Sequence, residues 1–208
     1  MVALRAPGAL VLLIGLTAVW AFMMLQFGSH EIYPLVGSYA LFASACALLA
    51  FGPKLRATLR VDVRSVLIGL GVGVLMTVAT YPLYRLTVQL VPALEPVVRG
   101  LYRTSHKEQL GTALAWVVVI LSAEELLFRG AWLLALERRF GRRASLAISV
   151  SLYALAQACT GSLIVALLAL TCGLVWTVER MLTGSVVAPW LSHLIWTPTV
   201  ILLRPVVG

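Results

Sequence analysis

Long apolar runs separated by short basic joints constrain the fold of this chain more than any other feature. Seven such runs can be drawn, over residues 9–27, 34–52, 65–91, 111–130, 144–160, 162–179 and 185–203. A helix of about 20 apolar residues crosses the hydrocarbon core of a bilayer and satisfies all its own backbone polar groups there. The runs predict an all-α, polytopic transmembrane bundle of about seven spans, with six to eight as the range.

The composition agrees with a membrane protein. Hydrophobic residues make up 61% of the 208 residues and charged residues only 12%, whereas a soluble domain carries about 25% charged residues. No stretch between the runs is long enough to fold as a soluble unit, so residues 1–208 are interpreted as a single membrane domain. The first run is too long for the core of a signal peptide, and we expect it to be retained.

The basic residues of the joints predict an orientation, because cytoplasmic joints are enriched in Lys and Arg. Ten lie in joints on the N-terminal side of the membrane: Arg5, Lys54, Arg56, Arg60, Arg64, Arg138, Arg139, Arg142, Arg143 and Arg180. Four lie in the opposite joints: Arg99, Arg103, Lys107 and Arg204. The bias predicts a cytoplasmic N-terminus. An arginine-rich, lysine-poor composition is typical of GC-rich bacterial genomes, which favours the bacterial cytoplasmic (inner) membrane.

The same joints account for the net charge of +8, because they meet anionic lipid headgroups. No nucleic-acid partner is therefore expected. The segment 132–143 combines aromatic residues and leucines with arginines, which is typical of a short interfacial helix on the inner leaflet. Gly69 and Gly73 predict a close contact between helices. Glu179 and Arg180 close an apolar run and are interpreted as marking the headgroup boundary.

Three ionisable residues stand where lipid should exclude them. Glu124, Glu125 and Arg129 end the fourth run, which is otherwise apolar. A charge at the centre of a bilayer costs on the order of 3 kcal/mol on insertion scales, so such residues usually have a function. Glu125 and Arg129 are four residues apart on a helix and are expected to pair. Glu124 has no partner in this motif and is the first candidate for a catalytic residue.

Two later runs add polar residues at the same helical spacing. Tyr153 and Gln157 lie in the fifth run, and His193 and Thr197 lie in the seventh. Residues four apart share one helix face, so both pairs can face one pocket with Glu124. A carboxylate in apolar surroundings is a competent general base near neutral pH. Histidine and threonine can donate hydrogen bonds to an oxyanion. Taken singly, Tyr153, Gln157 and Thr197 are better explained by hydrogen bonds between helices, and for His193 alone the two explanations are about equal.

The order of these motifs resembles the CPBP family of intramembrane glutamate-type endopeptidases, which includes CAAX prenyl proteases and bacterial Abi proteins. The family pattern is Glu-Glu-x-x-x-Arg, then Phe-x-x-x-His, then His-x-x-x-Asn. The stretch Glu124-Glu125-Leu-Leu-Phe-Arg129 matches the first motif, and the resemblance covers a core of about residues 111–203. It implies that Glu124 activates water, that Glu125 and Arg129 support it, and that His193 stabilises an oxyanion.

Two motifs depart from this pattern. The second reads Tyr153-Ala-Leu-Ala-Gln157, and the third reads His193-Leu-Ile-Trp-Thr197. Threonine can still donate a hydrogen bond in place of asparagine. Glutamine cannot take up a proton, although it can orient a water molecule. It also removes a possible metal ligand, and because a catalytic zinc usually has three protein ligands, no metal and no other cofactor are expected.

Two functions follow from the resemblance. One is a divergent endopeptidase that cleaves a membrane-anchored protein in or near its anchor, as bacterial sorting proteases of the family do with C-terminal anchors. The other is a catalytically inactive relative that binds a membrane partner or confers bacteriocin immunity. A transporter is a third class, but no inverted repeat is visible in the sequence.

Overall fold

The computed structural model describes residues 6–26, 32–105 and 108–207. Within these residues every regular element is helical, which confirms the predicted all-α class. Arg5, Lys107 and the predicted end of the first run at Phe27 lie outside the described residues. The elements are α1 Ala6–Met24, α2 Ile32–Phe51, α3 Pro53–Ala57, α4 Val63–Leu90, α5 Leu94–Ser105, α6 Leu110–Glu124, the π-helix η1 Glu125–Trp132, α7 Leu133–Ala158, α8 Leu163–Thr183, α9 Val187–Pro198 and the π-helix η2 Thr199–Leu203.

Five helical stretches are long and apolar enough to cross a membrane, which agrees with the predicted membrane protein. They are Pro7–Met24, Ile32–Phe51, Val63–Leu90, Leu110–Ala158 and Leu163–Thr183, and the apolar stretch Val187–Leu203 is shorter. The fourth and fifth predicted runs fall in one continuous stretch, so the division into seven spans stays a prediction.

That stretch reverses direction at Gly141. This residue has φ 71° and ψ 175°, a backbone conformation open mainly to glycine. On either side of it, Ser149 bonds to Phe128 and Tyr153 to Glu124. From Ser149 to Tyr153 the chain advances four residues, whereas their partners go back four residues, from Phe128 to Glu124. This is the pattern of two antiparallel helices. Residues 110–140 and 142–158 therefore run past each other.

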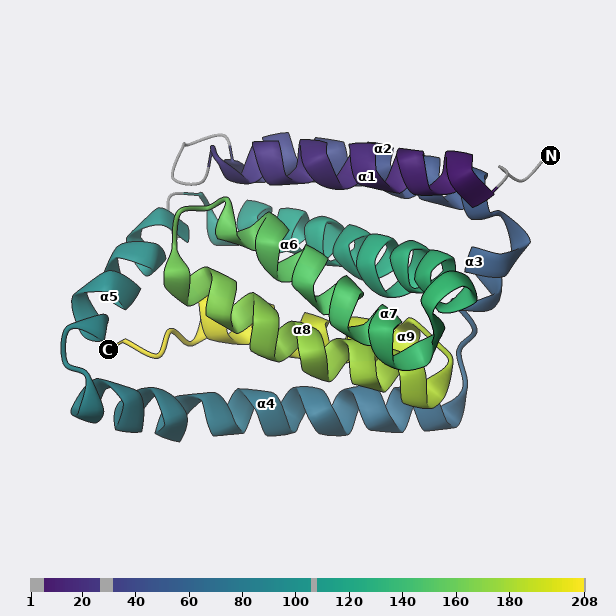
Figure 1. Cartoon of the computed structure of the whole chain (residues 1–208). Coiled ribbons are helices and arrows are strands. Elements are labelled where there is room, and N and C mark those ends of the chain that lie inside the picture. Colours follow the sequence, from purple (N-terminus) through teal and green to yellow (C-terminus); the bar gives the residue numbers. More distant parts are fainter. Residues whose placement is uncertain (1–5, 27–31, 106–107, 208) are drawn as a thin grey trace.

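Local sequence explains several helix ends. The Asp62 carboxylate accepts a hydrogen bond from the Ser65 amide at 2.9 Å and caps the start of α4, and Ser162 caps α8 in the same way. Such caps satisfy amide groups that have no partner within the helix. Gly184, with φ 72°, ends α8 in the left-handed conformation. The start of α4 and the end of α8 both lie at the end of the bundle where α1 begins (Figure 1).

This end is called the basic end, because it carries a concentration of Lys and Arg on α3, around the start of α4 and around Gly141. Figure 1 shows α1 beginning at this end, and α5 and the C-terminus at the opposite end. The basic residues are Lys54, Arg56, Arg60, Arg64, Arg138, Arg139, Arg142 and Arg143.

The segment 132–143, expected as an interfacial helix, does not lie wholly on the surface. Trp132, Leu133 and Leu136 are buried, and the Trp132 indole donates a hydrogen bond to Thr17 of α1 at 2.8 Å. Only the arginine-rich half, from residue 138 onward, is exposed. An orientation of this half along the membrane surface stays a prediction.

Helix α5 occupies part of the joint between the third and fourth predicted runs, where no helix was expected. Its Tyr102 hydroxyl donates a hydrogen bond to the Val200 carbonyl at 2.8 Å and accepts one from the Val206 amide at 3.3 Å. These bonds hold α5 against the end of the chain, across the end of the bundle opposite the basic end (Figure 1).

The predicted contact at Gly69 and Gly73 is confirmed, and the partner is α9. A Cβ atom added at Gly69 would lie 2.5 Å from the Ala188 carbonyl oxygen, and one at Gly73 would lie 2.9 Å from Ser192 Cα. No atom of a neighbouring element lies within 4 Å of that position at Gly71. The two glycines let α4 approach the helix that carries His193.

This asymmetry predicts a difference between two otherwise similar variants. Gly69→Leu should separate α4 from α9 and lower the free energy of unfolding by about 1–3 kcal/mol, the usual cost of overpacking. Gly71→Leu gains the same helix propensity without the collision and should be at least as stable as wild type. Thermal unfolding in detergent measures both. Equal stability of the two variants would contradict the packing described here.

Candidate active site

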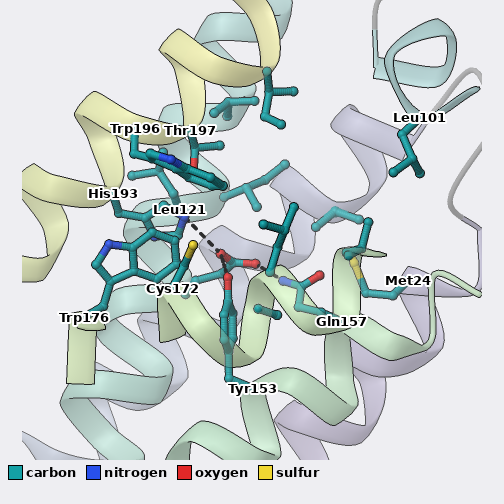
Figure 2. A pocket seen from close by; sticks show the side chains of 18 of the residues that line it. Met24, Leu101, Leu121, Tyr153, Gln157, Cys172, Trp176, His193, Trp196 and Thr197 are labelled. Carbon is teal, nitrogen blue, oxygen red and sulfur yellow. Dashed lines mark hydrogen bonds and ion pairs between the residues drawn. The ribbon is translucent and has the colours of Figure 1, made fainter. Parts of the chain in front are cut away.

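Four helices bring the predicted site residues together. Glu124 ends α6, and Glu125 and Arg129 follow in η1. Tyr153 and Gln157 lie in α7, and His193 and Thr197 lie in α9. Figure 2 shows Tyr153, Gln157 and His193 converging from different helices on one point. That point is the Glu124 carboxylate, which is buried. All six predicted site residues lie at or beside this point.

Hydrogen bonds to both oxygen atoms fix the Glu124 carboxylate. Gln157 Nε2 donates to Oε1 at 2.5 Å, and the Tyr153 hydroxyl donates to Oε2 at 3.1 Å. Each carboxylate oxygen can accept more than one hydrogen bond, so both retain capacity for a further donor such as water. Two of the three residues that depart from the family pattern, Tyr153 and Gln157, are therefore the residues that orient Glu124.

Glu125 and Arg129 form the predicted ion pair at the start of η1. Arg129 Nη1 lies 3.1 Å from Glu125 Oε1, and both side chains are 0% exposed. The Arg129 guanidinium also lies 4.2 Å from the centroid of Tyr153 and 5.3 Å from that of Trp176, within the range of cation–π attraction. Each charge is thus compensated by protein groups.

The pair lies in η1, a π-helical segment between α6 and α7. Such segments inside α-helices are frequent at functional sites.

A close approach of α8 completes this pair. The Gly173 carbonyl accepts a hydrogen bond from Arg129 Nη2 at 3.4 Å. A Cβ atom at position 173 would lie 3.1 Å from that nitrogen and 2.9 Å from Tyr153 Cδ1. A larger residue would therefore push α8 away from the ion pair. The sequence analysis did not single out Gly173, because its role depends on a contact between distant segments.

His193 lies between the two glutamates. Its Nδ1 is 2.9 Å from Glu125 Oε1 and its Nε2 is 3.9 Å from Glu124 Oε2. Arginine stays protonated in proteins, so Glu125 beside it is a carboxylate that accepts the Nδ1–H of His193. The imidazole also stacks on Trp176, with ring centroids 3.6 Å apart. The ring is therefore held with Nε2 toward Glu124, beyond direct hydrogen-bond distance.

Thr197 lies one turn after His193 on α9. Its Oγ1 is buried and has no hydrogen-bond partner within the part of the chain that the structure describes. Buried hydroxyl groups are normally satisfied. An unused donor beside a histidine is a group that a substrate can engage.

Glu124, His193 and Thr197 line one cavity of about 250 Å³. Most of its wall is apolar, and among the described lining residues Glu124 carries the only carboxylate. The lining residues come from α1, α2, α5, α6, α7, α8, α9 and η2: Met24, Ile32, Tyr33, Val36, Leu101, Val117, Ile120, Leu121, Glu124, Tyr153, Gln157, Val165, Leu168, Ala169, Cys172, Trp176, His193, Trp196, Thr197 and Ile201. Such a cavity suits an apolar ligand with a polar group at one point.

The arrangement offers little to a metal ion. Among residues 6–26, 32–105 and 108–207, no group of three His, Cys, Asp or Glu side chains is placed to hold one. The remaining candidates are two carboxylates and one histidine ring, and Arg129 and the His193 Nδ1–H already engage Glu125. The prediction that no metal is required stays a prediction.

Glu179 and Arg180, interpreted as headgroup markers, are buried inside the bundle, and their depth in the membrane stays a prediction. Helix α8 continues one turn beyond the predicted end of its run, to Thr183. Glu179 Oε2 accepts a hydrogen bond at 2.5 Å from Ser192, the residue before His193. The apolar run in the sequence ends at Glu179, but the helix continues to Thr183, and Glu179, Arg180 and Thr183 are still packed inside the bundle.

Together, the fold and the site define an integral membrane protein with a buried Glu–Gln–Tyr–His cluster in an apolar cavity. Residues 106–198 match the protein family described as type II CAAX prenyl endopeptidase Rce1-like. The matched segment contains all six predicted site residues, and the predicted resemblance to the CAAX protease family is confirmed over this segment. No curated protein and no solved structure matches the chain significantly.

The buried pair predicts a large loss of stability when one partner is removed. Arg129→Gln leaves Glu125 charged and buried and should lower the free energy of unfolding by about 3–5 kcal/mol. The double variant Glu125→Gln/Arg129→Gln should be less destabilised than Arg129→Gln alone, because neither charge remains.

The matched control is the pair Glu95–Arg99, which has the same spacing but side chains that are 41% and 42% exposed. Arg99→Gln should change stability by less than about 1 kcal/mol. Chemical unfolding in detergent measures these three variants together with the single variant Glu125→Gln. A double variant as unstable as the sum of its single variants would show that Glu125 and Arg129 do not interact.

Proposed function

We propose that this protein is an intramembrane endopeptidase that hydrolyses a peptide bond in or near the membrane-anchored segment of a protein substrate. The observation that carries the proposal is the Glu124 carboxylate, held by two donors at the wall of an apolar cavity and facing His193 Nε2. The match of residues 106–198 to an endopeptidase family supports the same reaction class.

Glu124 is proposed as the general base. A water molecule that enters from the cavity can donate a hydrogen bond to a carboxylate oxygen of Glu124. The carboxylate takes a proton from this water as its oxygen attacks the carbonyl carbon of the peptide bond. The proton then passes to the amide nitrogen, the C–N bond breaks, and a carboxylic acid and an amine are released. No metal is needed in this sequence.

His193 and Thr197 are proposed as the donors that stabilise the tetrahedral oxyanion. The Thr197 hydroxyl has no other partner among the described residues. His193 Nδ1 is engaged by Glu125, so Nε2 is the ring nitrogen that would donate to the oxyanion. Glu125 and Arg129 are positioning residues in this scheme, because they act through His193.

Gln157 supports the competing function. Its amide donates to the carboxylate that the family histidine would assist, and it cannot carry a proton. This observation favours a catalytically inactive relative that binds a membrane partner or an immunity target. In the catalytic proposal, Gln157 instead fixes the direction of Glu124 and shares the water that Glu124 activates.

A comparison of membrane-protein termini separates the two functions. Cells that express wild type, Glu124→Gln or no copy should differ in a small set of new termini. These termini should be present only with wild type, because the glutamine variant keeps the shape of the side chain and removes the base. Glu95→Gln, on the surface of α5, should give the wild-type pattern. Identical termini in wild type and Glu124→Gln would leave partner binding as the function.

The oxyanion donors give a second test, on a substrate that the first experiment identifies. Thr197→Val keeps the volume and removes the hydroxyl, and should lower kcat by about 10²–10³-fold. Thr197→Ser keeps a hydroxyl and should recover most of the rate. Equal rates for wild type and Thr197→Val would remove Thr197 from the mechanism.

A further inference from the structure

We infer that the catalytic cavity opens toward the extracytoplasmic face of the membrane, and that the substrate is an exported protein whose scissile bond lies at the outer end of its anchor between apolar residues. The inference rests on the proposed function for its chemistry. Its geometric part stands on the position of the cavity within the bundle and on the distribution of charge between the two ends.

The cavity lies toward one end of the bundle. Several lining residues come from the last or first turn of their helices, namely Met24 at the end of α1, Ile32 at the start of α2, Gln157 at the end of α7 and Val165 at the start of α8. Successive helices in a bundle of this kind alternate in direction. The end of α1 and α7 and the start of α2 and α8 therefore meet at the same face, which we call the pocket end.

The pocket end is opposite the basic end. Helix α1 begins at the basic end and reaches the pocket end at Met24, and Figure 1 places α5 and the C-terminus there as well. Leu101 of α5 lines the cavity, and Tyr102 ties α5 to Val200 and Val206. Within the described residues, no cavity-lining side chain comes from α3, from the start of α4 or from the turn at Gly141.

The two ends differ in charge in the way that membrane orientation requires. The basic end carries the eight exposed Lys and Arg residues named above and the buried Arg180, against Asp62, Glu137 and the buried Glu179. Around the pocket end the described basic residues are Arg85, Arg99, Arg103 and Arg204, and Arg99 is paired with Glu95 at 2.7 Å. Because positive charge is retained in the cytoplasm, the basic end is cytoplasmic and the cavity faces outward.

The wall of the cavity sets the chemistry of the cleaved segment. Leucine, isoleucine, valine, methionine and tryptophan side chains surround the point where Glu124 and His193 meet. Burying an unpaired charge there is costly, so residues on both sides of the scissile bond should be apolar or small. A peptide that reaches this point from outside belongs to a protein already translocated across the membrane, and its anchor supplies such residues.

Two matched cysteine variants test the orientation without any need for activity. In a chain with Cys46, Cys159 and Cys172 changed to Ala, Leu163→Cys places a thiol at the pocket end and Val61→Cys places one at the basic end. The native side chains at these positions are 73% and 75% exposed, so neither thiol is covered by the protein, and both positions lie at the ends of apolar helices. A membrane-impermeant maleimide should label Leu163→Cys in intact cells and Val61→Cys only after permeabilisation. The reverse pattern would overturn the inference.

A reporter on the otherwise unchanged chain guards against a folding defect in these variants. Alkaline phosphatase fused after the C-terminus, which follows Val206 at the pocket end, should be active, and green fluorescent protein at the same place should be dark. An inactive alkaline phosphatase fusion together with a fluorescent green fluorescent protein fusion would place the C-terminus in the cytoplasm. That result would overturn the outward opening of the cavity independently of the cysteine variants.

The termini from wild-type and Glu124→Gln cells then test the substrate class. The new termini should map to the outer end of transmembrane anchors, with apolar or small residues on both sides of the cleaved bond. Termini on the cytoplasmic side, or within charged segments, would overturn the inference while leaving the protease function intact. If no termini depend on Glu124, the protease function itself fails, and the labelling result still shows which face the cavity meets.

Discussion

The buried ion pair between Glu125 and Arg129 is the interaction on which the rest of the site depends. Neither side chain touches water, so each charge must be compensated inside the bundle. Arg129 donates a hydrogen bond to the Gly173 carbonyl and lies over two aromatic rings. Glu125 accepts a hydrogen bond from His193. This network joins η1, α7, α8 and α9. The same contacts that make the pair tolerable in the membrane orient the imidazole toward Glu124.

Adjacent glutamates thereby take different environments. Glu125 lies on the side of η1 that faces the arginine, and its charge is neutralised. Glu124 lies on the cavity side and accepts hydrogen bonds from the uncharged donors Tyr153 and Gln157. One residue of helical rotation, about 100°, separates the carboxylate that pairs with Arg129 from the carboxylate that lines the cavity. The contact of Gly69 and Gly73 with α9 fixes the position of α9, and with it the position of His193 between the two glutamates.

Much of this arrangement is predictable from the sequence, for physical reasons. Apolar runs reveal membrane helices because lipid excludes other residues, and the spacing of four in Tyr153–Gln157 and His193–Thr197 places each pair on one face. Helix α5 and the burial of Glu179 and Arg180 were not predictable in the same way. They depend on contacts between distant segments, such as Tyr102 with Val200 and Ser192 with Glu179, which no local pattern encodes.

The central claim is that Glu124 activates water to hydrolyse a peptide bond. It is tested most directly by incubating the purified protein in liposomes with a membrane-protein extract in ¹⁸O-labelled water. Hydrolysis by the proposed route places one ¹⁸O atom in each new terminal carboxylate, and the account predicts such termini with wild type and none with Glu124→Gln. Labelled termini of equal abundance with both proteins, or none with wild type, would contradict the account.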